Sequence, residues 1–214
     1  MCGLGFWQLD RMEQKEQRLA SIAQKQSGGL MGLQTAIRSA GDPRDLRVAF
    51  TGTPDTSRMM YLDNQIENGQ VGYDIVLPVR TDVGWALVNY GWVKGLPTRD
   101  TLPQVEIGKS LTEYEGVVTS PGYNPMVTET AVNATFPLRI QALDTDYLST
   151  LLRTPLIDYV VVLTTPDDKF IRNWSPVVMP PEKHLGYAIQ WFGLAFAALI
   201  IGLLALRKKE LSHE

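Results

Sequence analysis

The sequence LGYAIQWFGLAFAALIIGLLAL, from Leu185 to Leu206, contains no charged residue and a single amide, Gln190. An α-helix rises about 1.5 Å per residue, so about 20 apolar residues cross the hydrocarbon core of a bilayer. A buried helix of a water-soluble protein usually has a polar face, and this stretch has almost none. It therefore predicts a transmembrane helix, which we expect over residues 184–206, and a chain that is tethered to a membrane by its C-terminal end.

The residues that follow this span predict which side of the membrane its C-terminal end faces. Arg207, Lys208 and Lys209 come directly after it, and positive charge beside a span favours the cytoplasmic side. We therefore expect residues 207–214 to form a cytoplasmic tail in a bacterial inner membrane, with the main domain in the periplasm. The alternative is a tail-anchored protein with a cytoplasmic domain, which the basic cluster disfavours.

The N-terminal region predicts an exit from the membrane. A periplasmic domain needs an N-terminal export signal, and the apolar residues 1–7 (MCGLGFW) are too short for a signal peptide or a span. We therefore expect them to be the remnant of a first transmembrane helix. Residues Gln8 to Gln26 are rich in helix formers and contain no Gly or Pro, which predicts a solvated helix that ends at Ser27-Gly28-Gly29.

Composition excludes several classes of function. The net charge is −3 and 20% of residues are charged, without the basic excess of a nucleic-acid-binding protein. The 44% hydrophobic content excludes a disordered tether. One cysteine, Cys2, and two histidines, His184 and His213, leave no disulfide framework, no cysteine metal site and little histidine chemistry.

The main domain, expected over residues 8–183, has the pattern of a β-rich fold. Alternating or β-branched segments bounded by turn residues predict about seven strands. A helix is expected from Asp144 or Thr145, either of which can act as N-cap, to Leu152, with Tyr147, Leu148, Leu151 and Leu152 on its buried side. We expect an α+β fold that is mainly β, either an antiparallel barrel or an open sheet with flanking helices. The segments expected as strands are 46–53, 59–63, 71–80, 85–93, 110–118, 136–140 and 156–165, with a polar excursion over Tyr123–Ala134.

The sequence contains no G-x-S-x-G and no H-E-x-x-H motif. His184 is the one residue whose spacing from neighbouring side chains suggests a binding site. Gly108-Lys109-Ser110 lacks the first glycine of a phosphate-binding loop, because Pro103 occupies that position. His184 is expected at the membrane boundary, with Tyr187 three positions later and Trp191 seven positions later, on one helix face. An imidazole there can ligate a heme iron while the rings pack against the macrocycle. From the spacing alone, an interfacial aromatic belt with a histidine that bonds a lipid headgroup is the favoured interpretation.

Three blocks of sequence resemble the surfeit locus protein 1 family, whose members assist the assembly of cytochrome c oxidase. The first block is Gly5-Phe6-Trp7-Gln8-Leu9 with Arg11 and Lys15-Glu16. The second is Gly72-Tyr73 followed by Leu87-Val88-Asn89 and Gly91-Trp92-Val93. The third is Pro181 with His184-Leu185-Gly186-Tyr187-Ala188 and Gln190-Trp191-Phe192. Together they extend over nearly the whole chain. The resemblance implies two transmembrane helices that enclose an extracytoplasmic β-rich domain, of which this sequence contains the second.

The resemblance also implies a cofactor and partners. It predicts an assembly factor, not an enzyme, that binds heme A transiently at the outer membrane boundary and passes it to the catalytic subunit of the oxidase. The implied site residues are His184 as iron ligand, with Trp191 and Tyr187 against the macrocycle. Implied partners are that subunit, heme A synthase and the lipid bilayer, but no nucleic acid. The alternative hypothesis is a scaffold without heme that docks on a nascent oxidase subunit and stabilises it.

Overall fold

The structure, a computed structural model of the chain, describes residues 1–38, 41–98, 101–121, 135–175 and 179–211. The chain divides into two compact units. One combines the two ends, Met1–Gln24 and Ser175–Glu214, and the other is Lys25–Trp174. The predicted Tyr123–Ala134 excursion lies outside the described residues.

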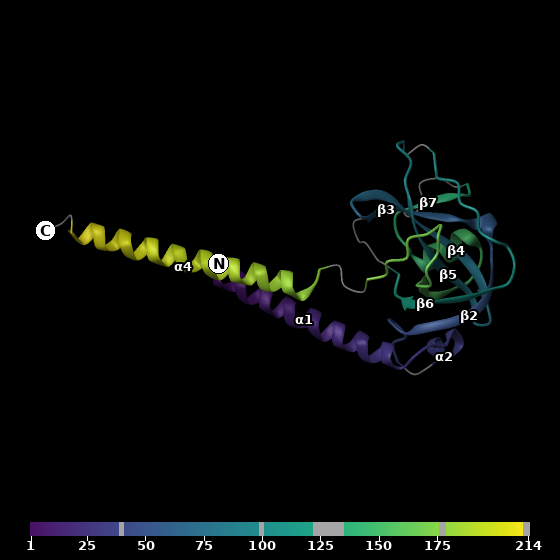
Figure 1. Cartoon of the computed structure of the whole chain (residues 1–214), viewed down its shortest axis with the longest axis horizontal. Coiled ribbons are helices and arrows are strands. Elements are labelled where there is room, and N and C mark those ends of the chain that lie inside the picture. The colour runs from purple at the N-terminus through teal and green to yellow at the C-terminus, as the bar shows by residue number, and fades with distance from the viewer. Residues whose placement is uncertain (39–40, 99–100, 122–134, 176–178, 212–214) are drawn as a thin grey trace. The chain divides into compact units, whose positions relative to one another are not determined.

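Two long helices form the first unit, and they lie side by side in Figure 1. Helix α1 is Cys2–Ser27, so it begins earlier than the helix predicted from Gln8. Helix α4 is Pro181–Leu211, and proline at a first helical position is favourable because its missing N–H has no intrahelical partner to lose. Within Pro181–Lys208 the most apolar 18-residue window has a mean hydropathy of 2.2 and contains no buried residue. This helix is long and apolar enough to anchor the protein in a membrane.

A closed five-stranded barrel forms the second unit. Its strands follow one another in the order β2, β6, β8, β5 and β4, and pairing of Thr53 with Arg80 and of Pro54 with Val79 joins β4 back to β2. Neighbours are antiparallel except β5 and β8, which are parallel. The strands are β1 (Met31–Gly32), β2 (Arg47–Pro54), β3 (Met60–Glu67), β4 (Gln70–Thr81), β5 (Gly84–Lys94), β6 (Thr112–Thr119), β7 (Leu138–Ile140) and β8 (Leu156–Leu163).

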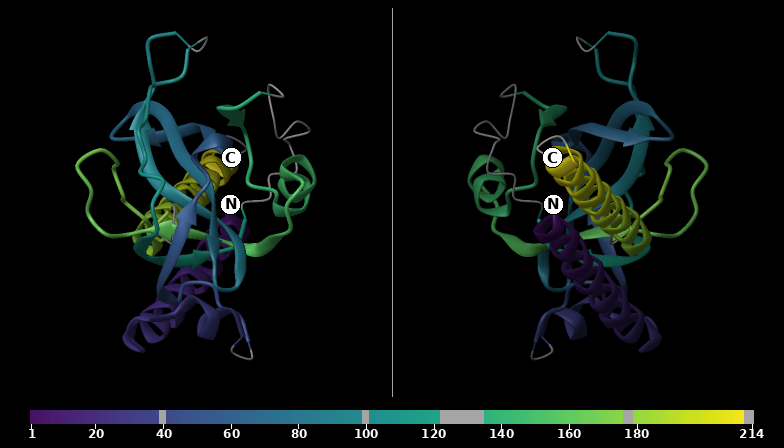
Figure 2. Two further views of the ribbon diagram at one scale, coloured as in Figure 1. Left: turned by 90° about the vertical axis from the view of Figure 1, so that its right-hand side faces the viewer. Right: turned by 90° about the vertical axis from the view of Figure 1, so that its left-hand side faces the viewer.

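The predicted fold class is confirmed, and the open choice between barrel and sheet is decided for the barrel. At the closure Gly52 has no side chain, and a Cβ there would lie 2.5 Å from Val79 Cγ1. Figure 2 shows the curved strands surrounding the barrel interior, with helix α3 (Thr145–Leu152, green) beside them. Strand β1 pairs with β2, strand β3 pairs with β4, and β7 runs parallel to β3.

Turn chemistry sets the register of the two hairpins. Asn68 and Gly69 both have positive φ, at 50° and 74°, as a two-residue turn between β3 and β4 requires. The connection between β4 and β5 is also two residues long, because Thr81 already pairs with Gly84. It is shorter than the four-residue connection expected from the sequence.

A bulge in β5 confirms the expectation that Gly91 marks an irregularity. Ile75 pairs with Gly91 but Val76 pairs with Asn89, so Tyr90 is the additional residue. Gly91 has a φ of 115°, and a Cβ there would lie 2.7 Å from the carbonyl oxygen of Ile171. The Asn89 side chain supports the bulge, since its Oδ1 accepts a hydrogen bond from Gly91 N and its Nδ2 donates one to Asp74 Oδ2.

Two hydrophobic clusters stabilise this unit. The first is enclosed by the barrel and includes Val48, Ile75, Leu77 and Val88. The second lies between the outer face of the sheet and α3, and includes Met60, Val76, Leu87 and Leu148. Both clusters use alternate residues of β4, as the period of two along a strand requires.

Helix α3 begins as predicted, and its buried face differs slightly from the prediction. Asp144 is the N-cap, and its side chain accepts a hydrogen bond from Tyr147 N. Leu148 and Leu152 are buried, whereas Tyr147, expected on the buried side, is exposed. Three short elements were not predicted, namely β1, helix α2 (Leu33–Arg38) and the 3-10 helix η1 (Thr56–Arg58).

Candidate functional site

Helix α1 packs closely against α4 because Gly5 has no side chain. A Cβ at Gly5 would lie 2.6 Å from Cζ of Phe192, so the ring occupies the space that a larger residue would fill. Phe6 contacts the same ring edge to face, with 5.2 Å between the ring centroids. The two helices run antiparallel, since Gly5 lies beside Phe192 and the later residue Gln8 lies beside the earlier residue His184.

His184 lies in this helix pair and is hydrogen-bonded to α1. Its Nδ1 is 2.7 Å from Oε1 of Gln8. An amide oxygen only accepts, so with the amide in this orientation Nδ1 carries the proton and Nε2 carries the lone pair. His184 is only 8% exposed, and Nε2 is a buried polar atom without a hydrogen-bond partner among the described residues.

The three predicted site residues differ in burial. His184 belongs to a stripe of buried and half-buried residues on α4 that recur every three or four positions. Trp191 lies on that stripe and is half-buried. Tyr187 lies at its flank and is 45% exposed. The stripe consists of Pro181, His184, Ala188, Trp191, Phe192 and Ala195.

The arrangement of His184 fits a metal-bound imidazole. A ligating histidine usually donates its other ring N–H to an oxygen, which sets the tautomer and the ring orientation. The Gln8 amide is such an oxygen, and the unpartnered Nε2 is the ligating atom that remains. The described residues contain no cluster of three or more His, Cys, Asp or Glu side chains that would hold a metal ion by themselves. A single histidine would suit an iron that takes its remaining ligands from another molecule, such as a porphyrin.

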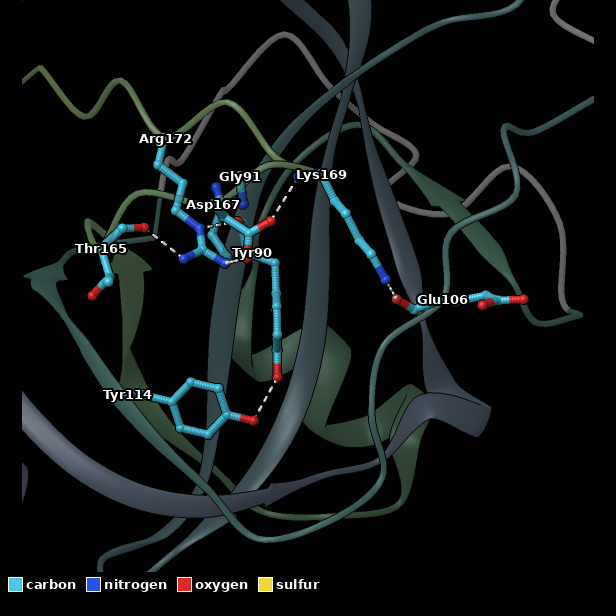
Figure 3. A network of polar contacts seen from close by, with 9 residues as sticks. Tyr90, Gly91, Glu106, Tyr114, Thr165, Asp167, Lys169 and Arg172 are labelled. Atoms are coloured by element: carbon cyan, nitrogen blue, oxygen red, sulfur yellow. Dashed lines mark hydrogen bonds and ion pairs between the residues drawn. The ribbon is translucent and has the colours of Figure 1, made fainter.

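A second site, not predicted from the sequence, is a pocket of about 680 Å³ in the barrel unit. Tyr90 and Tyr114 line it, and their hydroxyl oxygens are 2.7 Å apart. Burial, reinforced by the hydrogen bond to Tyr114, raises the pKa of Tyr90, so this phenol stays protonated. Figure 3 shows this pair below Arg172, which comes from the segment after β8.

Arg172 holds one wall of the pocket in place. Its Nε donates to the carbonyl oxygen of Tyr90 at 2.7 Å, and its terminal nitrogens donate to the Thr165 carbonyl at 2.6 Å and to Asp167 Oδ2 at 3.1 Å (Figure 3). Burial lowers the pKa of Arg172, and the nearby Asp167 carboxylate opposes that shift. Main-chain hydrogen bonds in both directions between Ile171 and Trp92 fasten the same segment to β5.

No sequence signal points to this pocket, because its residues come from four separate segments and none belongs to a known motif. The bulge glycine, Gly91, is the nearest clue, since it indicates that another backbone segment comes close. The sequence does not show which segment comes close to Gly91; in the structure it is residues 170–172.

Comparison with known proteins identifies the family. The SURF1 family model matches residues 1–196. The chain belongs to the SURF1 family. A "SURF1-like protein" of Rickettsia felis is 23% identical over 207 residues, which cover 94% of this chain and 89% of that protein.

The SURF1 family is an assembly-factor family associated with cytochrome c oxidase. The match includes both helices of the first unit up to Phe196, and so contains Gln8, His184 and Trp191. It also contains the whole barrel. This SURF1 family member therefore combines a barrel with one helix able to anchor it in a membrane.

Proposed function

We propose that this protein binds heme A at the α1–α4 helix pair and aids its insertion into the catalytic subunit of cytochrome c oxidase. The single observation that carries the proposal is the state of His184. Gln8 accepts a hydrogen bond from Nδ1 at 2.7 Å, and the buried Nε2 has no partner among the described residues. A buried nitrogen without a hydrogen bond is costly, so such atoms are candidates for a ligand-binding role.

Each residue has a defined part in this proposal. His184 holds the iron through Nε2, and Gln8 orients the imidazole. Trp191, one heptad further along the same stripe, packs against the macrocycle, and the exposed Tyr187 does so from the flank. Heme A, when bound, supplies the iron for coordination and a large apolar surface for burial. Because Nε2 is buried, loading requires a local rearrangement around His184.

Transfer requires that binding be reversible. A single histidine ligand gives a bond that a better site can replace, which suits delivery to an oxidase subunit. The expected donor is heme A synthase and the expected acceptor is the catalytic subunit. In the proposed topology Arg207 and Lys208 face the cytoplasm of a bacterial inner membrane, so the barrel and the His184 end of α4 lie on the outer side.

The test is the optical spectrum of the full chain purified from cells that make heme A. We expect bound heme in the wild type and at least about tenfold less in His184→Ala, the loss that follows removal of an axial ligand. His213→Ala is the matched control, because His213 is the other histidine of the sequence and lies in the tail. Equal heme in wild type and His184→Ala would contradict the proposal.

A second candidate function is a scaffold that docks on a nascent oxidase subunit and carries no heme. It is favoured by the burial of His184, since a buried nitrogen is not accessible without rearrangement. The two functions are separated by crosslinking to the oxidase subunit. Crosslinking that persists in His184→Ala, with normal heme content in the oxidase, supports the scaffold; loss of heme from the oxidase supports delivery.

A further inference from the structure

The pocket of the barrel unit, which the proposed function does not use, has an uncharged floor and is open to solvent. Its volume of about 680 Å³ is in the range of small-molecule sites. Four buried residues line its floor, namely Tyr90, Tyr114, Leu163 and Phe170. Every other lining residue is exposed or half-buried. A ligand can therefore enter from solvent, and the buried side chains that it meets are uncharged.

The floor of the pocket is largely aromatic and preformed. The ring of Tyr90 contacts those of Tyr114 and Phe170, at centroid distances of 5.9 Å and 6.0 Å. All three rings belong to the hydrophobic cluster that the barrel encloses. Glu113 and Glu115 flank Tyr114 in β6, so their side chains point to the opposite face of the strand and bring no charge to the floor. The ring contacts hold the floor in shape before any ligand arrives.

The tyrosine pair leaves one hydrogen-bond donor unused. The hydroxyl oxygens of Tyr90 and Tyr114 are 2.7 Å apart and share a single hydrogen bond, so one O–H proton serves that bond and the other does not. The described residues provide no further acceptor for either hydroxyl. Both tyrosines are more than nine-tenths buried, at 5% and 6% exposed. A buried donor without an acceptor is unfavourable, so a ligand oxygen that accepts this proton would be stabilised in the pocket.

We propose that this pocket binds a small neutral molecule that carries a carbonyl oxygen on an aromatic body. The carbonyl oxygen accepts the unused tyrosine proton, and the aromatic body packs against the rings of Tyr90, Tyr114 and Phe170. A charged group is disfavoured at the floor, because burying a charge without a partner is costly. The barrel thus has a ligand site of its own, formed within residues 90–172 and independent of His184.

The test follows the methyl resonances of Leu163 in the full chain in lipid nanodiscs, because Leu163 lies in the floor of the pocket. The two probes are acetophenone and ethylbenzene, which share a ring and differ by a carbonyl in place of a methylene group. We expect acetophenone to shift Leu163 saturably and to leave Leu111, which is exposed and outside the pocket, without a saturable shift. The absence of a saturable shift at Leu163 would overturn the proposal.

A double variant tests the hydrogen bond without removing the rings. Tyr90→Phe with Tyr114→Phe should lower the affinity for acetophenone relative to ethylbenzene about fivefold, which corresponds to about 1 kcal/mol for one hydrogen bond. Partitioning of the probes into lipid is the same for every variant, so it cancels in this comparison. Tyr147→Phe is the matched control, since Tyr147 is exposed and does not line the pocket. An unchanged affinity ratio in the double variant, or an equal loss in the control, would overturn the proposal.

Discussion

Gln8 of α1 and His184 of α4 are joined by a hydrogen bond of 2.7 Å between Oε1 and Nδ1, across 176 positions of sequence. The bond connects the predicted ligand to helix α1, and with the amide in this orientation it determines which imidazole nitrogen is protonated. Loss of this bond would therefore remove the constraint on the tautomer and on the ring orientation of His184.

The first prediction concerns this bond. Gln8→Leu removes the acceptor for Nδ1–H, so the heme-free protein should contain a mixture of His184 tautomers, visible in the imidazole 15N spectrum. In the heme-loaded protein we expect an affinity loss of about 10- to 100-fold, typical of removing the partner of a metal-bound histidine. Gln17→Leu is the control, because Gln17 is exposed and bonds only to Glu13 on its own helix. An unchanged 15N spectrum in Gln8→Leu would show that the bond does not set the tautomer.

The second prediction concerns the packing of α1 on α4. Gly5→Leu places a side chain where the Phe192 ring lies, so the helices should separate near their contact. Spin labels at Cys2 and at Ala198→Cys, both exposed positions, should report a longer and broader distance distribution. Adding Phe192→Ala should restore the distance. Gly3→Leu is the control, since no atom lies within 4 Å of a Cβ at Gly3, and a shift of equal size there would exclude the steric explanation.

The third prediction concerns the β5 bulge. Gly91 and Gly84 share a φ of 115°, but only at Gly91 would a Cβ meet another segment, 2.7 Å from the Ile171 carbonyl. Gly84→Ala should cost about 1–3 kcal/mol for the backbone conformation alone. Gly91→Ala should cost about 2 kcal/mol more, because residues 170–172 must move away. Urea unfolding followed by near-ultraviolet circular dichroism measures both, and equal losses would argue against the close approach.

The fourth prediction concerns Asp74. Burial raises the pKa of Asp74, while the hydrogen bond from Asn89 opposes that shift. Because the pKa of Asp74 is higher in the folded than in the unfolded state, the charged carboxylate lowers the free energy of unfolding. This destabilisation is fully present above the folded pKa. It disappears as the pH falls below the unfolded pKa, because both states are then neutral.

Asp74→Asn keeps an oxygen that accepts from Asn89 Nδ2 and removes the charge. It should therefore stabilise the barrel at neutral pH by on the order of 1 kcal/mol, the scale of burying an imperfectly paired polar group. The gain should shrink toward zero as the pH is lowered through this window. Thermal melts of both proteins across a pH series measure it, and a gain that grows at low pH would contradict the assignment. Asp158→Asn, an exposed change, should leave the melting temperature unaltered at every pH.

Local features of the chain were predictable from sequence because their causes are local. The apolar run before Arg207 predicts α4, Asn68-Gly69 predicts a tight turn, and Asp144 predicts a helix start, since each depends on neighbouring residues only. The continuous apolar run of β4 from Ile75 to Val79 is typical of a strand that is buried on both faces. It does not reveal that one face lies inside a barrel and the other against α3, because periodicity reports burial and not the partner.

The candidate sites show the same division. Sequence alone determined that His184 is one of two histidines and begins an apolar helix, and the family blocks made it the expected ligand. Only the tertiary structure decided that Gln8 is hydrogen-bonded to Nδ1 of His184 and that Tyr187 is exposed. It also decided that β4 pairs with β2, and that the hydroxyl groups of Tyr90 and Tyr114 contact each other in a pocket. Each of these findings depends on which residues distant in the chain come into contact. The free energy of such a contact appears only after folding has brought the residues together.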